Sequence, residues 1–284
     1  MEQIVFVVWR ESIEALLVVG ILYSWLKQTG ATGAMRYLWM GVGGGVLMAL
    51  GLAAALLGMQ QFLSGSGQDI FMLVLMLVAT GLIVHMVLWM RRHGRHLHSH
   101  LTSQTRQALE NRSFWSIAAL VAIAIGREGS ETVIFLYGTS FAQQTAQDWT
   151  VFTGAVLLAL ALAGASYALL QLGRRWLSWR YFFKITEIML LLLASALLLS
   201  AVDRMMALGW LPTGIDPLWD SSGLLDDGSR LGGVVSALTG YRAYPALTDV
   251  LAWLGFWLAI AGLFYQQKHY QKHQQKQQQA TTSA

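Results

Sequence analysis

Two short stretches of this chain combine an arginine with a pair of glutamates at the same spacing. Residues 9 to 18 read WRESIEALLV and residues 126 to 135 read GREGSETVIF, so each stretch contains Arg-Glu-x-x-Glu. The chain has seven glutamates, and four of them lie in these two motifs: Glu11, Glu14, Glu128 and Glu131. Residues three positions apart share a face of a helix, so the two carboxylates of each motif are predicted to point the same way.

If the two helices meet, these four carboxylates and the guanidinium groups of Arg10 and Arg127 converge. Carboxylate oxygens are hard ligands that suit a small, highly charged cation. The arginines would then hold the site near neutrality until the cation arrives. The alternative is that each Arg–Glu pair is a buried ion pair that fixes helix register. Because the motif occurs twice, and charges inside a membrane usually serve a function, we favour the cation site.

The sequence around both motifs is strongly apolar. Hydrophobic residues make up 55% of the 284 residues and charged residues only 12%, against about 25% charged in soluble globular proteins. This composition predicts a multi-pass, all-α integral membrane protein, which we expect in the cytoplasmic (inner) membrane. The apolar runs predict seven transmembrane helices, at residues 4–26, 37–59, 70–90, 114–139, 151–172, 181–202 and 248–266. The motifs lie in the first and fourth, where their charges must avoid lipid.

The spacing of the motifs also predicts an internal repeat. A shift of 117 residues superposes Arg10 on Arg127 and three predicted helices on three others. The predicted repeats cover about residues 4–90 and 114–202, with three helices each. Because an odd number of helices reverses the direction of the chain through the membrane, the two repeats are predicted to be inverted, with the site at their interface. Most lysines and arginines fall on one side, which predicts an outside N-terminus and a cytoplasmic C-terminus. The net charge of +4 follows this topology and does not point to nucleic acid.

Other polar residues are weaker candidates. Glu187 is expected to pair with Lys184 at the cytoplasmic edge, with an exit ligand as the alternative. His85 is expected to be an interior histidine with a satisfied hydrogen bond, with a metal ligand as the alternative. The His-rich stretch RRHGRHLHSH is read mainly as a basic cytoplasmic loop that could also receive metal.

The outer loop, residues 203–247, carries several acidic residues. Asp220, Asp226 and Asp227 could attract cations or dock a partner, or could cap helices and build turns. The apolar piece LGGVVSALTGY is too short to span a membrane and predicts a re-entrant or interfacial helix. The polar, Gln-rich tail, residues 267–284, is expected to be cytoplasmic and disordered.

The doubled motif resembles the oxidase-dependent iron permease family, which includes fungal high-affinity iron permeases and bacterial elemental-iron uptake permeases. The stretches MVLWMRRHGRHL and LWDSSGLLDDGS resemble the same family. Its motif usually reads R-E-G-x-E, whereas the first copy here has Ser12, and the second has Ser130 where an apolar residue is common. We expect these hydroxyls to bond to backbone.

The resemblance implies a seven-helix permease domain over residues 1–266, an outside N-terminus and motif glutamates that bind the translocating iron. It also implies an iron-oxidising partner protein outside the cytoplasm. The chain contains no cysteine and no P-loop, so redox chemistry and energy come from elsewhere. We therefore expect an iron transporter, not an enzyme, with no organic cofactor.

Both valences of iron remain open from the sequence. Ferric iron is the harder ion and suits an all-carboxylate site better than ferrous iron. The alternatives to iron transport are a carrier for another divalent cation or a proton-coupled substrate, and a membrane redox subunit that holds haem through His85.

Overall fold

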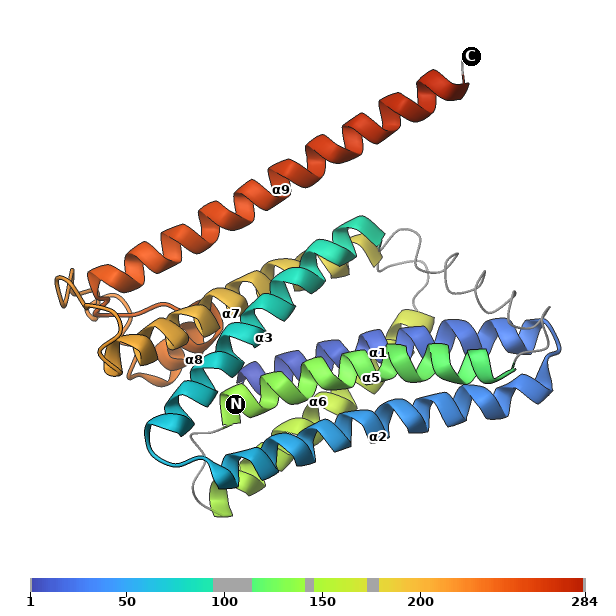
Figure 1. Cartoon of the computed structure of the whole chain (residues 1–284), viewed down its shortest axis with the longest axis horizontal. Helices are drawn as coiled ribbons and strands as arrows, with labels where there is room; N and C mark the ends of the chain where they lie inside the picture. Colours follow the sequence, from blue (N-terminus) through green and yellow to red (C-terminus); the bar gives the residue numbers. More distant parts are fainter. Residues whose placement is uncertain (1, 94–113, 141–145, 173–178, 283–284) are drawn as a thin grey trace.

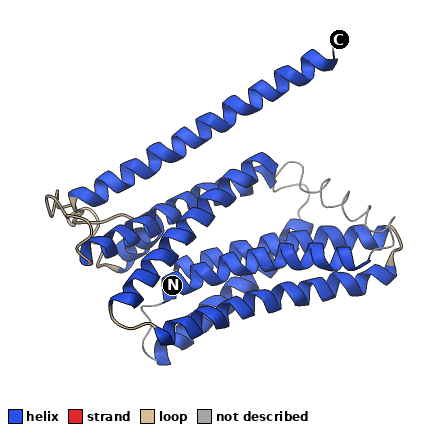
Figure 2. Cartoon of the chain, viewed as in Figure 1, coloured by secondary structure: helices blue, strands red, loops and turns tan. Residues whose placement is uncertain are grey.

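In the computed structural model of the chain, residues 2–93, 114–140, 146–172 and 179–282 are described. These parts consist of helices joined by loops and turns, without a strand (Figure 2). Each predicted apolar run falls inside one of seven long helices: α1 (Glu2–Gln28), α2 (Thr32–Phe62), α3 (Ser66–His93), α5 (Phe114–Ser140), α6 (Ala146–Leu172), α7 (Trp179–Ala207) and α9 (Leu247–Thr282). A short helix, α8 (Arg230–Thr239), lies in the outer loop.

Five of the long helices, namely α2, α3, α6, α7 and α9, are long and apolar enough to cross a membrane. The other two, α1 and α5, have 27 residues each, which is also enough to span, but each carries the three charges of a motif. These two helices therefore need the rest of the bundle to shield their polar face from lipid.

The main helix pairs join helices of the first predicted repeat to helices of the second. The motif helices α1 and α5 lie against each other, α2 packs on α5, α6 packs on α1, and α3 packs on α7 (Figure 1). The long α9 lies at the edge of the bundle beside α7. Helices α1 and α5 each pack against at least two of the other helices, so the charged motifs lie where these helices meet.

Small residues set how closely two of these helix pairs approach. On α2, a Cβ atom added at Gly41 would lie 2.6 Å from the carbonyl oxygen of Ala118, and one at Gly45 would lie 2.7 Å from the Cβ of Ile125. On α1, Gly20 leaves room for the side chain of Tyr167 on α6. Close backbone approach through small residues is the usual way in which membrane helices associate.

Two apolar clusters flank the motifs. One joins Val7, Phe135 and residues of α3, α7 and α9, and the other joins Leu22, Leu26 and residues of α2 and α5. The motif side chains lie between these clusters along α1 and α5. The apolar packing on both sides fixes the helices that present the carboxylates.

The outer loop folds over one end of the bundle. Helix α8 is capped at its start by Ser229, whose hydroxyl accepts from the N–H of Gly232 at 3.0 Å, and after its end by Gly240 with φ 77°. The side-chain amide of Gln3 on α1 donates to the carbonyl of Ala237 in α8. Thus the short helix expected in this loop is present, and it is tied to the start of α1.

The predicted disorder of the tail is wrong for residues 267 to 282, because α9 continues to Thr282 without a break. Glutamine, lysine and alanine are good helix formers, so a polar segment that follows an established helix can extend it.

Candidate cation site

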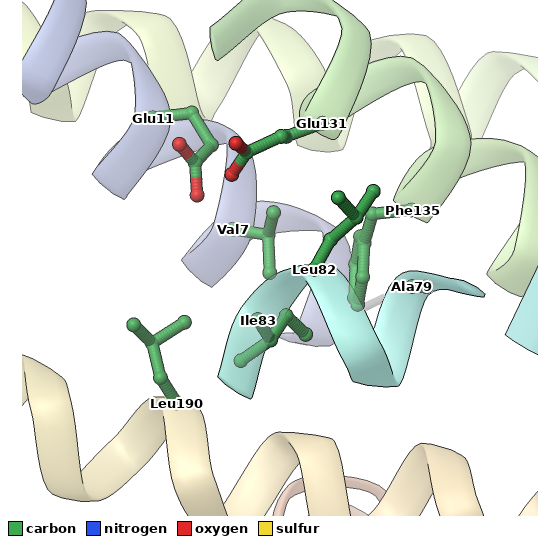
Figure 3. A pocket seen from close by; sticks show the side chains of 8 residues that line it. All are labelled: Val7, Glu11, Ala79, Leu82, Ile83, Glu131, Phe135 and Leu190. Atoms are coloured by element: carbon green, nitrogen blue, oxygen red, sulfur yellow. The ribbon is translucent and has the colours of Figure 1, made fainter. Parts of the chain in front are cut away.

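Helices α1 and α5 bring the two motifs together. Glu11, Glu128 and Glu131 each offer one carboxylate oxygen, and these three oxygens lie within 4.8 Å of one another. Figure 3 shows Glu11 on α1 and Glu131 on α5 pointing toward each other above a layer of apolar side chains. A cation between the helices could therefore contact oxygens from both motifs.

The fourth motif glutamate, Glu14, lies outside this group of three. It forms an ion pair with Arg10, whose guanidinium also donates to the Oε1 of Glu11 at 2.7 Å. The Arg10 side chain is only 1% exposed. Two thioethers of α3 complete its surroundings, because Met86 Sδ lies 3.0 Å and Met90 Sδ lies 3.5 Å from its nitrogens.

The second arginine has different surroundings. The Nε of Arg127 lies 3.0 Å from the Oε1 of Glu131, and its guanidinium carbon lies 5.0 Å from the ring centroid of Trp89 on α3. The Arg127 side chain is 33% exposed, so it is far less enclosed than Arg10. Both motif arginines thus neutralise glutamates of their own helix, but only Arg10 is fully buried.

Two carboxylate oxygens of the group have no hydrogen-bond partner among the described residues. They are the Oε2 atoms of Glu11 and Glu128, and both are buried. A buried acceptor without a partner is costly, and such atoms in a native fold call for an explanation. Both oxygens belong to the group of three carboxylates, so a bound cation would supply the missing interaction.

Two cavities reach the carboxylates from different sides. A small one, of about 10 Å³, lies between α1, α3, α5 and α7 and is lined by Glu11, Glu131 and apolar side chains; this is about the room of a single water molecule. A larger, open one of about 190 Å³ lies between α1, α2 and α5 and includes Glu11 and Glu128. The carboxylates therefore lie between a narrow, mostly apolar cavity and a wider, open cavity.

The residues inside the motifs have local structural roles. The hydroxyl of Ser130 donates to the carbonyl of Arg127 at 2.8 Å, which confirms the backbone interaction expected there. Ser12 lines the larger cavity. Gly129 is needed for packing, because a Cβ atom at this position would lie 2.6 Å from the Cβ of Ala49 on α2.

The iron permease FTR1 family matches residues 1–271 of this chain. The chain belongs to this family. Its relatives include proteins named ferrous iron permease EfeU from Escherichia coli O157:H7, 28% identical over 246 residues that cover 86% of this chain and 88% of the relative. Another EfeU, from Yersinia pestis, is 26% identical over 261 residues that cover 91% of each chain. No solved structure matches this chain.

Membership of the iron permease family confirms the resemblance drawn from the doubled motif, and it supports iron transport across a membrane as the activity of this chain. The match extends well beyond the two motifs, since it includes every long helix up to most of α9.

Two of the weaker candidates have other surroundings than expected. The carboxylate of Glu187 pairs with Arg91 on α3, not with Lys184, because the end of α3 lies beside the start of α7. His85 is exposed on α3 and is not part of the carboxylate group, so the prediction of an interior histidine is wrong. Periodicity alone did not show which face of α3 the bundle covers. Most of the His-rich stretch, residues 94–100, lies outside the described residues.

The acidic residues of the outer loop have hydrogen bonds within that loop. The carboxylate of Asp220 accepts from the N–H and hydroxyl of Ser222, and these bonds lower its pKa below the usual value. Asp226 accepts from the N–H of Gly228 at 3.0 Å, and Asp227 from the N–H of Ala243 at 3.2 Å. These contacts favour turn building over cation capture for the three aspartates.

Three residues near the motif arginines were not predicted from the sequence: Met86, Trp89 and Met90. All three come from one turn of α3, and their spacing of three and four residues was the available signal. Nothing in their chemistry distinguishes them from ordinary apolar residues of a membrane helix, so only the structure connects them with the arginines.

Proposed function

We propose that this chain carries iron across the cytoplasmic membrane and that the ion binds between Glu11, Glu128 and Glu131 during its passage. The observation that carries the proposal is the approach of one oxygen from each of these carboxylates to within 4.8 Å of the others. Two of the three residues also hold a buried oxygen without a hydrogen-bond partner. Oxygen ligands of this kind suit iron as a hard cation.

The motif charges bear on the valence of the ion. Four carboxylates and two guanidinium groups carry a formal charge of about −2 when all are ionised. A ferrous ion would bring this set to neutrality, whereas a ferric ion would leave a buried positive charge, and buried charges need compensation. In this proposal Glu14 contributes to the charge balance through Arg10, and the ferrous ion is the better match.

The membrane arrangement is part of the proposal. All seven long helices span the membrane, with the N-terminus outside and the C-terminus in the cytoplasm, and α9 lies outside two inverted repeats. The helix pairs support the inverted relation: α2 packs on α5 as α6 packs on α1, while α1 meets α5 and α3 meets α7. An exchange of the two repeats turns the α2–α5 pair into the α6–α1 pair and leaves the α1–α5 and α3–α7 pairs as they are.

The partner and the energy source are also proposals. The chain has no cysteine for a cluster or thiolate of its own, so any oxidation of iron falls to an iron-oxidising partner protein outside the cytoplasm. Movement of a cation through the membrane is driven by the membrane potential, a proton gradient or that partner. The chain itself transports the ion and performs no chemical conversion.

The test is uptake of radioactive iron by iron-starved cells that depend on this chain. We expect Glu11→Gln, Glu128→Gln and Glu131→Gln each to lower the initial rate at least about tenfold, as expected when one ligand of a metal site is lost. The matched control is Glu187→Gln, which alters a carboxylate that pairs with Arg91 outside the group and should keep most of the uptake.

The same assay distinguishes the valences and the alternatives. Iron is supplied once with ascorbate as ferrous iron and once as ferric citrate, and the membrane level of each variant is measured by immunoblot. Normal uptake by two of the three glutamate variants at normal protein level would rule out the carboxylate site. Manganese or zinc that competes better than iron would favour a carrier for another cation.

A further inference from the structure

The two motif arginines differ in how firmly they are held. Arg10 contacts Glu11, Glu14, Met86 and Met90, and its side chain is 1% exposed. To leave its carboxylates it would have to break all these contacts inside the protein. Arg10 is therefore a fixed charge.

The other arginine has fewer constraints. Arg127 pairs with Glu131 at 3.0 Å, lies over the ring of Trp89 at 5.0 Å and is 33% exposed. Because a third of its side chain is not covered by other residues, rotation away from Glu131 would break fewer contacts than the same motion of Arg10. Arg127 is therefore the arginine that can release its carboxylate.

The carboxylate that Arg127 holds is also one of the proposed iron ligands. Glu131 belongs to the group of three carboxylates, whereas Glu14, the residue in the same position of the first motif, does not. Arg127 and an incoming cation thus compete for the same carboxylate. The strength of this competition depends on how well Arg127 is kept in place beside Glu131.

We propose that Trp89 is a positioning residue that holds Arg127 beside Glu131, so that Arg127 acts as a tethered competitor of the transported cation. This inference rests on the proposed function, because it assumes that the cation uses Glu131. The indole of tryptophan is the aromatic ring that attracts a guanidinium most strongly. With iron bound, the ring keeps Arg127 nearby, and when iron leaves, Arg127 returns to Glu131.

If Trp89 holds Arg127 beside Glu131, its removal changes the affinity for the cation, whereas a purely structural role would not. Without the indole, Arg127 competes less well, so the cation binds more tightly and leaves more slowly. A partly exposed cation–π contact is worth about 0.5–1 kcal/mol, which corresponds to about a 2–5-fold change in an equilibrium constant. Trp89→Leu should therefore lower the Kd for ferrous iron about 2–5-fold and lower the maximum rate of uptake.

The experiment measures both quantities on the full chain. Binding of ferrous iron is measured anaerobically by calorimetry on purified protein in lipid nanodiscs, and uptake in cells gives KM and the maximum rate. Trp89→Phe keeps an aromatic face and should lie between wild type and Trp89→Leu. The matched control is Trp39→Leu on α2, where the indole is 57% exposed, and it should leave both Kd and KM unchanged.

A double variant tests whether Trp89 acts through Arg127. Arg127→Gln removes the competitor and should tighten ferrous iron binding at least as much as Trp89→Leu does. Adding Trp89→Leu to Arg127→Gln should then change the Kd by less than about 1.5-fold, since the arginine through which the ring acts on the cation is absent. A further tightening in the double variant would contradict the proposal.

Two other results would also overturn it. One is a fall in maximum rate with Kd and KM unchanged or raised in Trp89→Leu, which is what a structural defect gives. The other is Trp89→Phe behaving like Trp89→Leu. Glu131→Gln separates this inference from the proposed function. If Glu131→Gln binds and transports iron normally, the proposed site is wrong. If Glu131→Gln no longer binds iron while Trp89→Leu has the Kd of the wild type, only the role of Trp89 is refuted.

Discussion

Replacement of Arg10 by methionine should destabilise the protein more than any other single change in the motifs. The guanidinium of Arg10 is buried and pairs with both glutamates of its own motif, whose side chains are 5% and 17% exposed. Methionine fits beside Met86 and Met90 and roughly fills the space of the arginine stem. The variant therefore removes the charge while it keeps much of the packing.

The size of the effect follows from this burial. Removing one partner of a buried ion pair costs about 3–5 kcal/mol, because the other charge stays buried without compensation. Arg127→Met is the matched control: Arg127 is 33% exposed and less enclosed by other side chains, so its removal should cost less, about 1 kcal/mol. We expect the difference between the two variants to be at least about 2 kcal/mol.

The measurement is the free energy of unfolding of each variant in mixed micelles, by titration with SDS and circular dichroism. Adding Glu11→Gln to Arg10→Met removes one of the stranded charges and should restore at least about 1 kcal/mol. The penalty should also shrink as the pH falls, because protonation of Glu11 or Glu14 removes an uncompensated negative charge.

Equal losses of stability for Arg10→Met and Arg127→Met would refute this reasoning. In that case the difference in burial between the two arginines has no energetic consequence, and the distinction between a fixed and a releasable charge fails with it. A loss for Arg10→Met that does not depend on pH and is not relieved by Glu11→Gln would point to a packing defect instead.

Three further predictions concern other parts of the site. Gly129→Ala should cost about 1–3 kcal/mol by forcing α2 away from α5, since its Cβ would lie 2.6 Å from that of Ala49; Ala49→Gly in the same chain should recover most of the loss in the SDS titration. In this cysteine-free chain, Glu11→Cys combined with Glu131→Cys should be bridged by cadmium within one molecule, seen as protection of both thiols from maleimide labelling. Asp226→Asn should keep iron uptake within about twofold, because asparagine retains the acceptor for the turn.

Controls for these predictions come from the same chain. Gly81→Ala has open space around the added Cβ and should not disturb stability as Gly129→Ala does. Each single cysteine variant lacks a second thiol, so cadmium should leave it open to maleimide. If maleimide labels the double cysteine variant in cadmium as fast as the single variants, the two motifs do not face each other. If Asp226→Asn loses uptake, the outer loop takes part in iron capture.

The meeting of the two motifs was predictable from the sequence, but the division of roles within them was not. The doubled Arg-Glu-x-x-Glu in two apolar stretches required both sets of charges to avoid lipid, and their mutual contact was the simplest solution. The repeat implies equivalence of Glu14 and Glu131, yet only Glu131 belongs to the group of three. The side chains of α3 also surround Arg10 and Arg127 unequally, so the two motifs have different neighbours.

Helix positions were predictable for a similar reason, and helix faces were not. An apolar run long enough to span a bilayer identifies a helix directly, and every predicted run lies in a helix. Which face is covered depends on neighbours that can be distant in the chain. His85 and Glu187 illustrate this: their surroundings depend on how α3 lies against other helices, and hydropathy does not contain that information.

The unbroken course of α9 sets how far the C-terminus stands from the bilayer. Its apolar part, Leu247–His269, has 23 residues and is enough for a hydrocarbon layer of about 30 Å. The rest of the helix, to Thr282, is rich in glutamine and lysine and adds about 20 Å at 1.5 Å per residue. The helix thus acts as a rigid spacer, and a fluorescent protein or affinity tag fused to the C-terminus would be held clear of the lipid headgroups instead of lying against them.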